Sequence, residues 1–174
     1  MRQINHYIAG KSYSDESEST ASVFAPNTGD VQAEVFLANQ NTLQKAVDSA
    51  LAAQTEWAAT NPQRRARVMF KFKELLEANR DRLAQLLSSE HGKVLSDAQG
   101  DIQRGLEVIE FACGIPHAQK GEYTEGAGPG IDVYSMRQAL GVVAGITPFN
   151  FPAMIPMWMF GVAIACGNSF ILKP

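Results

Sequence analysis

The chain of 174 residues carries 15 Lys and Arg against 18 Asp and Glu, a formal net charge of −3, and 45% of its residues are apolar. This balance excludes an intrinsically disordered chain, which needs low hydrophobicity and high net charge, and it indicates a globular domain with a core. The sequence has no cluster of Lys or Arg, so its charge gives no reason to expect binding to nucleic acid or to an anionic membrane.

The two cysteines, Cys113 and Cys166, lie far apart in apolar surroundings, and neither has a second Cys or a His at a metal-ligand spacing. We therefore expect buried, reduced thiols in a reducing compartment, and no metal site. The N-terminal residues resemble neither an apolar signal segment nor an Arg-rich transit segment. The expected location is the cytoplasm.

The first forty residues have the composition of strands and turns. Residues 4–13 are expected to be extended around a turn, and the polar residues 12–22 are expected to form a loop. The turn-forming cluster at 26–30 precedes residues 31–37, which favour a strand.

Four helices are expected in the middle of the chain. Apolar residues recur at intervals of three and four over 42–58, which is the pattern of an amphipathic helix. Asn61 and Pro62 mark the start of a second helix, because Asn can cap free N–H groups and Pro has none to leave unpaired. A third helix is expected to end at Gly92, and a fourth to cover about 93–113.

The C-terminal part of the chain changes character. Residues 121–130 are rich in Gly and predict a loop, and the alternating residues 131–136 predict a strand. No residue from 138 to 172 is charged, and this stretch predicts a strand, a turn, a helix and a strand of a parallel sheet covered on both faces. Its longest apolar run contains Pro156 and falls short of the roughly 20 residues that cross a membrane.

The turn at 146–152 is where the residues themselves suggest chemistry. It follows a buried strand, and open α/β sheets bind ligands at the carboxyl ends of their strands. Pro148 and Pro152 restrict the backbone on either side of Asn150 and would hold its amide as a donor to a developing oxyanion. The alternative is an Asn that satisfies carbonyl groups of its own loop. The sequence contains neither a dinucleotide-binding glycine fingerprint nor a Walker loop.

Several motifs resemble the aldehyde dehydrogenase superfamily, and together they cover essentially the whole chain. They are Asn-His-Tyr-Ile-Ala-Gly-Lys at 5–11, Ala-Pro-Asn-Thr-Gly at 25–29, Glu-His-Gly-Lys at 90–93, Arg-Gly-Leu-Glu-Val-Ile-Glu-Phe-Ala at 104–112, Gly-Val-Val-Ala-Gly-Ile-Thr-Pro-Phe-Asn-Phe-Pro at 141–152, the Trp at 158 and Gly-Asn-Ser-Phe-Ile-Leu-Lys-Pro at 167–174. Within the superfamily the sequence is most similar to the coenzyme A-acylating methylmalonate-semialdehyde branch. The resemblance implies an α/β fold, the N-terminal part of an aldehyde dehydrogenase-like structure, whose Rossmann-like parallel sheet is incomplete in this chain.

The resemblance also implies a reaction and a cofactor. A cysteine attacks a small-molecule aldehyde, hydride passes to NAD, and coenzyme A as co-substrate takes the acyl group. Asn150 matches the amide of the oxyanion hole, and Lys173 matches a lysine that binds the adenosine ribose of NAD. The residues matching the segment beside the cofactor are Ile146, Thr147, Pro148 and Phe149. The alternative for Lys173 is a lysine at a sheet edge.

Three further residues match substrate positions of the family. Phe151 and Trp158 match aromatic residues of the substrate tunnel, with core packing as their alternative. Arg104 matches an arginine that binds the carboxylate of a semialdehyde, because a guanidinium can hold both oxygens. Its alternative is a solvated arginine on a helix. Neither Cys113 nor Cys166 matches the nucleophile, so the chain alone is expected to be inactive.

We expect three parts in the chain. Residues 1–124 would form strands and helices of the cofactor-binding domain, 125–140 the strands of an oligomerisation arm, and 141–174 the first strand, helix and strand of the NAD-binding sheet. One such unit cannot cover both faces of its sheet, because sheets usually have about four to six strands. The expected partners are therefore the remainder of a longer polypeptide or a homo-oligomer, a dimer or a tetramer.

Two alternatives stay open from the sequence. One is a fragment of a non-acylating semialdehyde dehydrogenase, which would release a free acid. The other is a non-catalytic binding or oligomerisation module. An independent module should carry polar residues on the faces it exposes, whereas residues 138–172 contain no charge.

Overall fold

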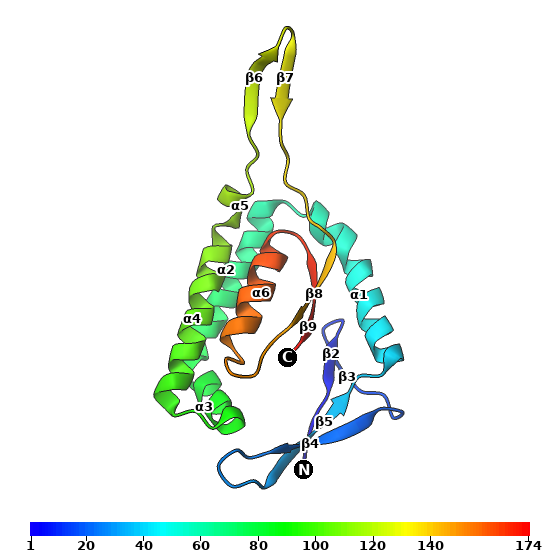
Figure 1. The fold of residues 1–174 in the computed structure, drawn as a ribbon, viewed down its shortest axis with the longest axis vertical. Coiled ribbons are helices and arrows are strands. Elements are labelled where there is room, and N and C mark those ends of the chain that lie inside the picture. Colours follow the sequence, from blue (N-terminus) through cyan, green and yellow to red (C-terminus); the bar gives the residue numbers. More distant parts are fainter.

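The computed structural model describes all 174 residues, and its N-terminal part consists of short strands (Figure 1). Their bounds are β1 (Arg2–Ile4), β2 (His6–Ile8), β3 (Lys11–Tyr13), β4 (Ser19–Phe24) and β5 (Val31–Leu37). β5 lies between parallel β1 and antiparallel β4, while β2 and β3 form a separate hairpin. The strand expected at 31–37 is confirmed.

The loop expected over residues 12–22 is wrong at both of its ends. The chain is still in β3 at Ser12, and from Ser19 onward it forms β4. β4 is rich in Ser and Thr and has one exposed face, so it lacks the apolar signal of a strand. Its backbone pairs with β5, a contact between distant residues that decides the conformation.

The four predicted helices are confirmed, and a short fifth follows them. Their bounds are α1 (Gln40–Ala59), α2 (Pro62–Ala78), α3 (Arg80–His91), α4 (Leu95–Cys113) and α5 (Ile115–Ala118). The side chain of Asn61 accepts a hydrogen bond of 2.8 Å from the N–H of Gln63, as a cap of α2 should. Gly92 ends α3 with a φ of 84°, a left-handed conformation that glycine adopts without strain.

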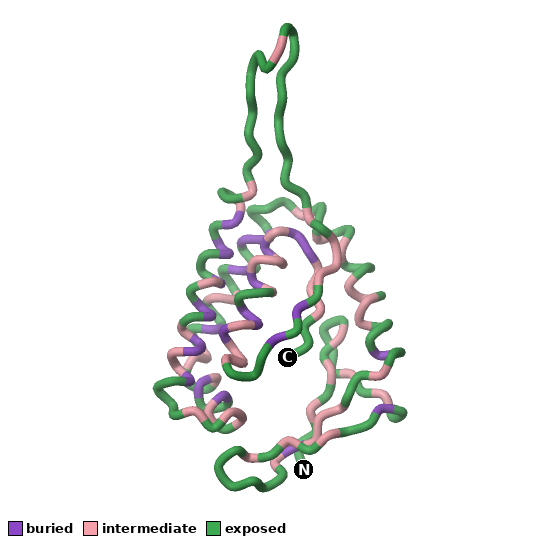
Figure 2. The backbone as a smooth tube through the Cα atoms, viewed as in Figure 1, coloured by how far each residue is buried: buried purple, intermediate pink, exposed green.

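A hairpin projects from the body of the molecule between α5 and the C-terminal unit (Figure 1). It consists of β6 (Tyr123–Gly128) and β7 (Ile131–Tyr134), and nearly all of it is exposed (Figure 2). The expected loop at 121–130 is therefore wrong over β6, although a strand at 131–134 is confirmed. The pairing of the two strands is irregular between Thr124 and Gly128, and the glycines of the segment accommodate this irregularity.

The predicted strand, turn, helix and strand are confirmed at the C-terminal end. They are β8 (Val142–Ile146), α6 (Met154–Ala165) and β9 (Ser169–Lys173), and β8 and β9 are parallel. The two strands lie between α6 and α1, both of which contact them (Figure 1). Each face of this small sheet is thus covered by a helix.

The core lies among α2, α3, α4 and α6, where the buried residues are concentrated (Figure 2). α4 and α6 approach each other closely because each has a glycine at the contact. A side chain at Gly105 would overlap Met157, and one at Gly161 would come within 2.6 Å of Ile109. None of the helices is both long enough and apolar enough to cross a membrane.

Candidate active site

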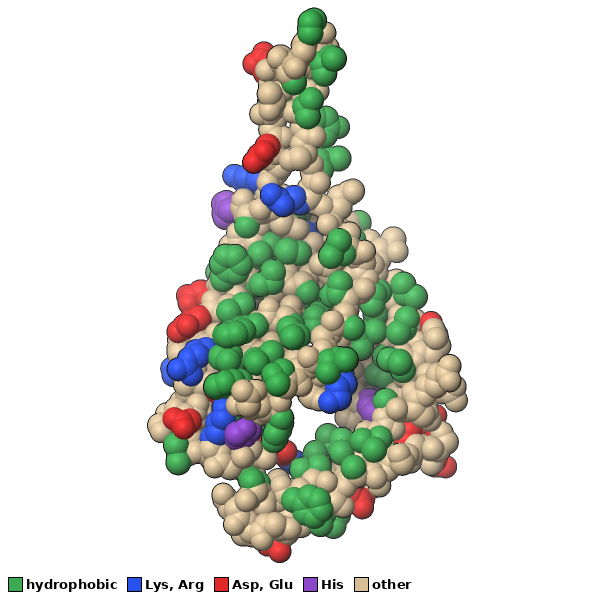
Figure 3. All heavy atoms as spheres, viewed as in Figure 1, with side chains coloured by type: hydrophobic (Ala, Val, Ile, Leu, Met, Phe, Trp, Pro, Cys, Tyr) green, Lys and Arg blue, Asp and Glu red, His purple; other side chains and the backbone are tan.

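The turn between β8 and α6, residues 147–153, starts at the carboxyl ends of two parallel strands. Ile146 at the end of β8 pairs with Lys173 at the end of β9. The N–H of Thr147 donates to the main-chain oxygen of Lys173 over 3.1 Å and so continues the pairing by one residue. This edge borders an open space between the helices and the N-terminal strands, and the space-filling view shows that side chains leave it hollow (Figures 1 and 3).

Asn150 lies in this turn with an exposed side chain. Its amide makes no hydrogen bond with the rest of the protein, so it does not satisfy carbonyl groups of its own loop, which was the alternative from the sequence. Pro148 and Pro152 flank it as expected and fix φ at both positions. The geometry leaves an amide donor free at the carboxyl edge of the sheet.

The aromatic neighbours of Asn150 pack on the junction of α3 and α4. The rings of Phe149 and His91 lie 5.1 Å apart between centroids. The Lys93 ammonium lies 4.2 Å from the centroid of the Phe151 ring, which is a cation–π contact. Phe149 is nevertheless 63% exposed, whereas Phe151 is half-buried. The residues on either side of Asn150 therefore both contact the junction of α3 and α4.

A buried carboxylate supports the other end of the turn. Asp101 on α4 has no exposed surface, and its Oδ1 accepts a hydrogen bond of 2.7 Å from the N–H of Met154, the first residue of α6. Its Oδ2 pairs with Lys93 Nζ at 3.3 Å. Neither Asp101 nor Lys93 was among the site residues predicted from the sequence. The available signal was that Asp101 falls on the apolar face of its helix, next to Ile102 and one turn from Ala98.

Arg104 and Trp158 lie together, on α4 and α6. The indole Nε1–H of Trp158 donates to the main-chain oxygen of Arg104 over 3.2 Å. The Arg104 side chain is exposed and forms no ion pair, since none of its neighbours offers a carboxylate within 4.0 Å. Trp158 is 44% exposed, so it is not part of the closed core.

The remaining predicted residues lie at the ends of the two strands. Ile146 is 76% exposed, and Thr147 is buried. The ammonium of Lys173 is exposed and donates to the main-chain oxygen of Pro174 over 2.7 Å. The structure thus brings the residues expected near the cofactor to one edge, next to Asn150.

Both thiols lie away from this edge. Cys113 is buried at the end of α4, and Cys166 follows the last residue of α6. The turn carrying Asn150 precedes α6, whose 12 residues span about 18 Å at 1.5 Å per residue. Burial raises the pKa of both thiols, so neither has the depressed pKa of a reactive cysteine.

A cavity of about 510 Å³ lies near Cys166, at the opposite end of α6 from Asn150. The buried Arg65 lines it and donates to main-chain oxygens of Ala58, Thr60 and Ala165. These oxygens belong to the C-terminal ends of α1 and α6, where the helix dipoles are negative and offset the guanidinium charge. Arg65 therefore joins helix ends, and the cavity adds nothing to the candidate site.

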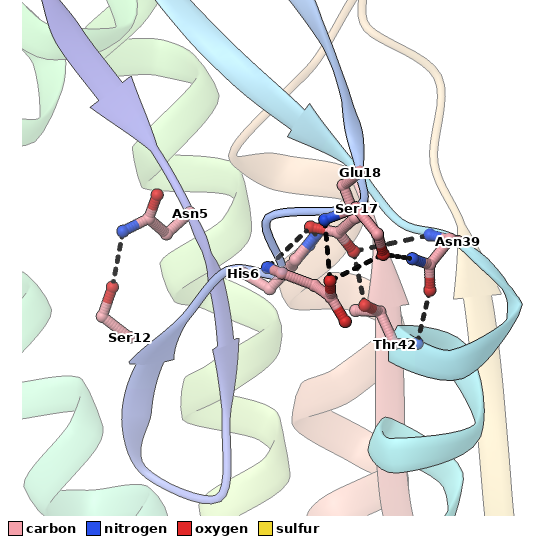
Figure 4. Close-up of polar contacts among 8 residues, drawn as sticks. Asn5, His6, Ser12, Ser17, Glu18, Asn39 and Thr42 are labelled. Carbon is pink, nitrogen blue, oxygen red and sulfur yellow. Dashed lines mark hydrogen bonds and ion pairs between the residues drawn. The ribbon is translucent and has the colours of Figure 1, made fainter.

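A second polar cluster lies at the N-terminal strands (Figure 4). The buried carboxylate of Glu18 accepts hydrogen bonds from the hydroxyl of Thr42 and the N–H of Asp15, and it contacts His6 Nε2 at 3.1 Å. Burial alone would raise the pKa of Glu18, but these hydrogen bonds outweigh burial and lower it. The cluster joins the β2–β3 hairpin to the start of α1 and is structural.

The chain is similar to known proteins over its whole length. A sequence model described as the aldehyde dehydrogenase family matches residues 13–174. Malonate-semialdehyde dehydrogenase of Pseudomonas aeruginosa is 53% identical over 174 residues, which are 100% of this chain and 35% of that protein. The mitochondrial acylating methylmalonate-semialdehyde dehydrogenase of Arabidopsis thaliana is 48% identical over 172 residues, which are 99% of this chain and 28% of that protein.

A solved structure from Sinorhizobium meliloti 1021 has the same fold. It is assigned to methylmalonate-semialdehyde dehydrogenase and was determined with NAD. The TM-score is 0.97 with 62% sequence identity, and the match covers 100% of this chain and 35% of that one. The chain thus spans about a third of the length of the relatives it matches.

Proposed function

Because the chain belongs to the aldehyde dehydrogenase family, we propose that it supplies part of the active site of an NAD-dependent enzyme that oxidises malonate or methylmalonate semialdehyde. The products are NADH and acetyl- or propionyl-coenzyme A, so the substrate carboxylate leaves as CO2 and the remaining acyl group passes to coenzyme A. The names of the Pseudomonas aeruginosa and Arabidopsis thaliana relatives support the substrate class, and the latter's name includes the acylating reaction. The NAD complex of the Sinorhizobium meliloti structure supports the cofactor.

The free amide of Asn150 is the observation that carries the proposal. It is exposed at the carboxyl edge of parallel strands and has no partner within the protein. When a thiolate attacks an aldehyde, the carbonyl oxygen becomes negative, and the Asn150 N–H2 donates a hydrogen bond to that oxygen. We place the attacking cysteine and the general base in the length of the relatives that this chain does not span.

Lys173 and the segment from Ile146 to Phe149 fit a dinucleotide. They lie at adjacent strand ends, and the exposed ammonium of Lys173 can donate to ribose hydroxyls. When bound, NAD accepts the hydride of the aldehyde. The protein's own part at this edge is to bind and orient, with Lys173 as the donor and the exposed side chain of Ile146 as apolar contact surface.

Arg104 is proposed to bind the substrate carboxylate. It is exposed, lacks an ion-pair partner, and lies on the same helix as Asp101, whose other contacts reach the Asn150 turn. A guanidinium holds both oxygens of a carboxylate, which a plain aldehyde does not offer. Phe151 and Trp158 contribute the aromatic walls beside it.

The organisation of the chain follows from the same assignment. We propose that residues 1–124 and 141–174 belong to the cofactor-binding domain, and that 125–140 form an oligomerisation arm. The exposed apolar side chains of the projecting hairpin, Ile131, Val133 and Tyr134, support an arm that packs on another copy of the chain. We also place the protein in the cytoplasm, because both cysteines are unpaired.

The test uses a completed enzyme, in which this chain is joined to the part of a relative that it does not cover. A chimaera with the remainder of the Pseudomonas aeruginosa protein is one example. We expect NADH and a coenzyme A thioester from malonate semialdehyde. Free acid alone would favour a non-acylating dehydrogenase. No NADH above a blank would favour a non-catalytic module.

Substrate selection is tested by replacing Arg104. In the completed enzyme, Arg104→Ala should raise KM for carboxylate-bearing aldehydes by tenfold or more, since charge-assisted hydrogen bonds contribute about 1.5–3 kcal/mol. KM for a plain aldehyde such as propanal should change little. Arg82→Ala, which removes an exposed arginine of α3 without an ion pair, is the matched control. Equal effects on both aldehydes would remove the assignment.

A further inference from the structure

Two residues outside the predicted site hold the segment that follows Asn150. Asp101 is completely buried, and both of its carboxylate oxygens are engaged, one by the N–H of Met154 at 2.7 Å and one by Lys93 Nζ at 3.3 Å. Lys93 in turn lies 4.2 Å from the centroid of the Phe151 ring. The pair thus contacts Phe151 in the turn and Met154 at the start of α6, one and four residues after Asn150.

The hydrogen bond from Met154 replaces a missing helix cap. The residue before α6 is Ala153, which has no side chain that could accept the free N–H groups at the start of the helix. Asp101 accepts one of them from a different helix. The start of α6 is therefore located by its contact with α4 rather than by its own sequence.

Stability alone does not explain this arrangement. Burying a charged pair costs desolvation energy that the attraction offsets only in part, and apolar replacements are often neutral or stabilising. What the pair adds is local restraint, because its contacts hold both the Phe151 ring and the first N–H of α6. Asn150 directly precedes the first of these contacts.

We propose that Lys93 and Asp101 are positioning residues that aim the Asn150 amide at the reacting oxygen. The inference rests on the proposed function. The ion pair holds the Phe151–Met154 segment from α4 and from the loop before it, while the pairing of Thr147 with Lys173 holds the other side of the turn. An oxyanion donor must be held within a few tenths of an ångström, which an exposed turn does not achieve unaided.

Two substitutions in the completed enzyme separate positioning from general stability. Asp101→Asn keeps an oxygen for the N–H of Met154 but turns N–H groups toward the Lys93 ammonium. Lys93→Met removes the charge and keeps an unbranched side chain against Phe151. Each should lower kcat/KM by about tenfold with KM for NAD within twofold. The double variant, in which neither charge is left unpaired, should recover part of the loss. Asp97→Asn on the exposed first turn of α4 is the control.

The decisive measurement is the effect of the same substitutions on kcat/KM in the Asn150→Ala background. Loss of the amide should by itself lower kcat by about 10² to 10³. If Asp101 acts through that amide, Asp101→Asn and Lys93→Met should cost less than a further twofold in this background. A full tenfold further loss would overturn the proposal, and so would unchanged kcat/KM in both single variants of the otherwise native enzyme.

A second measurement does not depend on turnover. Hydrogen–deuterium exchange of peptides covering 147–157 should be faster in the Asp101→Asn and Lys93→Met variants than in the parent, while peptides of the β6–β7 hairpin should be unchanged. Unaltered exchange at 147–157 would overturn the positioning role. If the parent enzyme oxidises no aldehyde but exchange behaves as expected, the proposed function fails while the restraint on the turn stands.

Discussion

The indole Nε1–H of Trp158 donates to the main-chain oxygen of Arg104 over 3.2 Å and joins the two residues proposed to meet the substrate. The bond runs from α6 to α4, the helices that also meet at Asp101 and Met154. Two hydrogen bonds therefore link these helices on the side of the candidate site. A displacement of α6 relative to α4 would therefore move the indole of Trp158 away from the Arg104 guanidinium.

The first prediction concerns this indole. Trp158→Phe in the completed enzyme removes the N–H and keeps an aromatic ring. We expect a loss of about 0.5–1.5 kcal/mol in stability, the usual net value of a hydrogen bond, and a several-fold higher KM for malonate semialdehyde. Steady-state kinetics and thermal unfolding measure the two effects.

Trp57→Phe is the matched control for Trp158. The indole of Trp57 also donates to a main-chain oxygen, that of Ile164 at 2.9 Å, but it lies at the other end of α6. This variant should lose similar stability with KM unchanged. A KM increase of the same size in both variants would show that the effect does not come from the substrate wall.

The second prediction tests the contact of α4 with α6. Gly105→Ala places a Cβ in the space of the Met157 side chain and 3.3 Å from the Met154 Cα. Because the Met154 Cα is a main-chain atom at the start of α6, it can move away only if the helix shifts. Overpacking of this kind costs about 1–3 kcal/mol. We expect a lower melting temperature together with a reduced kcat.

Gly100→Ala on the same helix provides the comparison. Its Cβ would lie 3.7 Å from a guanidinium nitrogen of Arg104, an ordinary contact, and Ala is the better helix former by about 0.5–1 kcal/mol. The melting temperature should therefore stay the same or rise. A fall equal to that of Gly105→Ala would mean that the α4–α6 contact is not the cause.

Much of this fold could be predicted where neighbouring residues decide the conformation. Asn61 and Gly92 act on their own helix ends, and the uncharged stretch around β8, α6 and β9 is apolar because the sheet is covered on both faces. The strands β4 and β6 were missed, since one is polar and the other rich in Gly. Their conformation depends on a paired strand elsewhere in the chain.

The candidate site divides in the same way. Asn150 is recognisable from the prolines beside it and from its motif. Asp101 contacts Met154, which lies 53 residues further along the chain, so no local pattern reveals the hydrogen bond. A carboxylate on an apolar helix face is nevertheless a usable signal, because such a charge needs a partner.

The third prediction follows from the lowered pKa of Glu18. Because hydrogen bonds from Thr42, Asp15 and His6 to the buried carboxylate lower its pKa below the ordinary value of 4.5, the ionised group stabilises the folded state above pH 4.5. This contribution is lost as the pH falls below 4.5 through the folded pKa. Glu18→Gln should lower the melting temperature at pH 7, and the difference from the parent should shrink in acid.

Glu16→Gln, at an exposed position two residues earlier, controls for the loss of one negative charge. It should leave the melting temperature nearly unchanged at every pH. A pH-independent difference between Glu18→Gln and the parent would contradict the role of ionisation. In that case the loss would reflect altered packing around Thr42 alone.

The last prediction concerns the two thiols. Both have a raised pKa from burial, and Cys166 lies at the far end of α6 from Asn150. Cys113→Ala and Cys166→Ala together should therefore leave kcat of the completed enzyme within about threefold, whereas loss of a true nucleophile typically costs orders of magnitude. For the same reason, the 174-residue chain alone should form no NADH from NAD, coenzyme A and malonate semialdehyde. The absorbance of NADH measures turnover in both experiments. Turnover by the chain alone, abolished by Cys166→Ala, would place the nucleophile here and overturn the division of the active site proposed above.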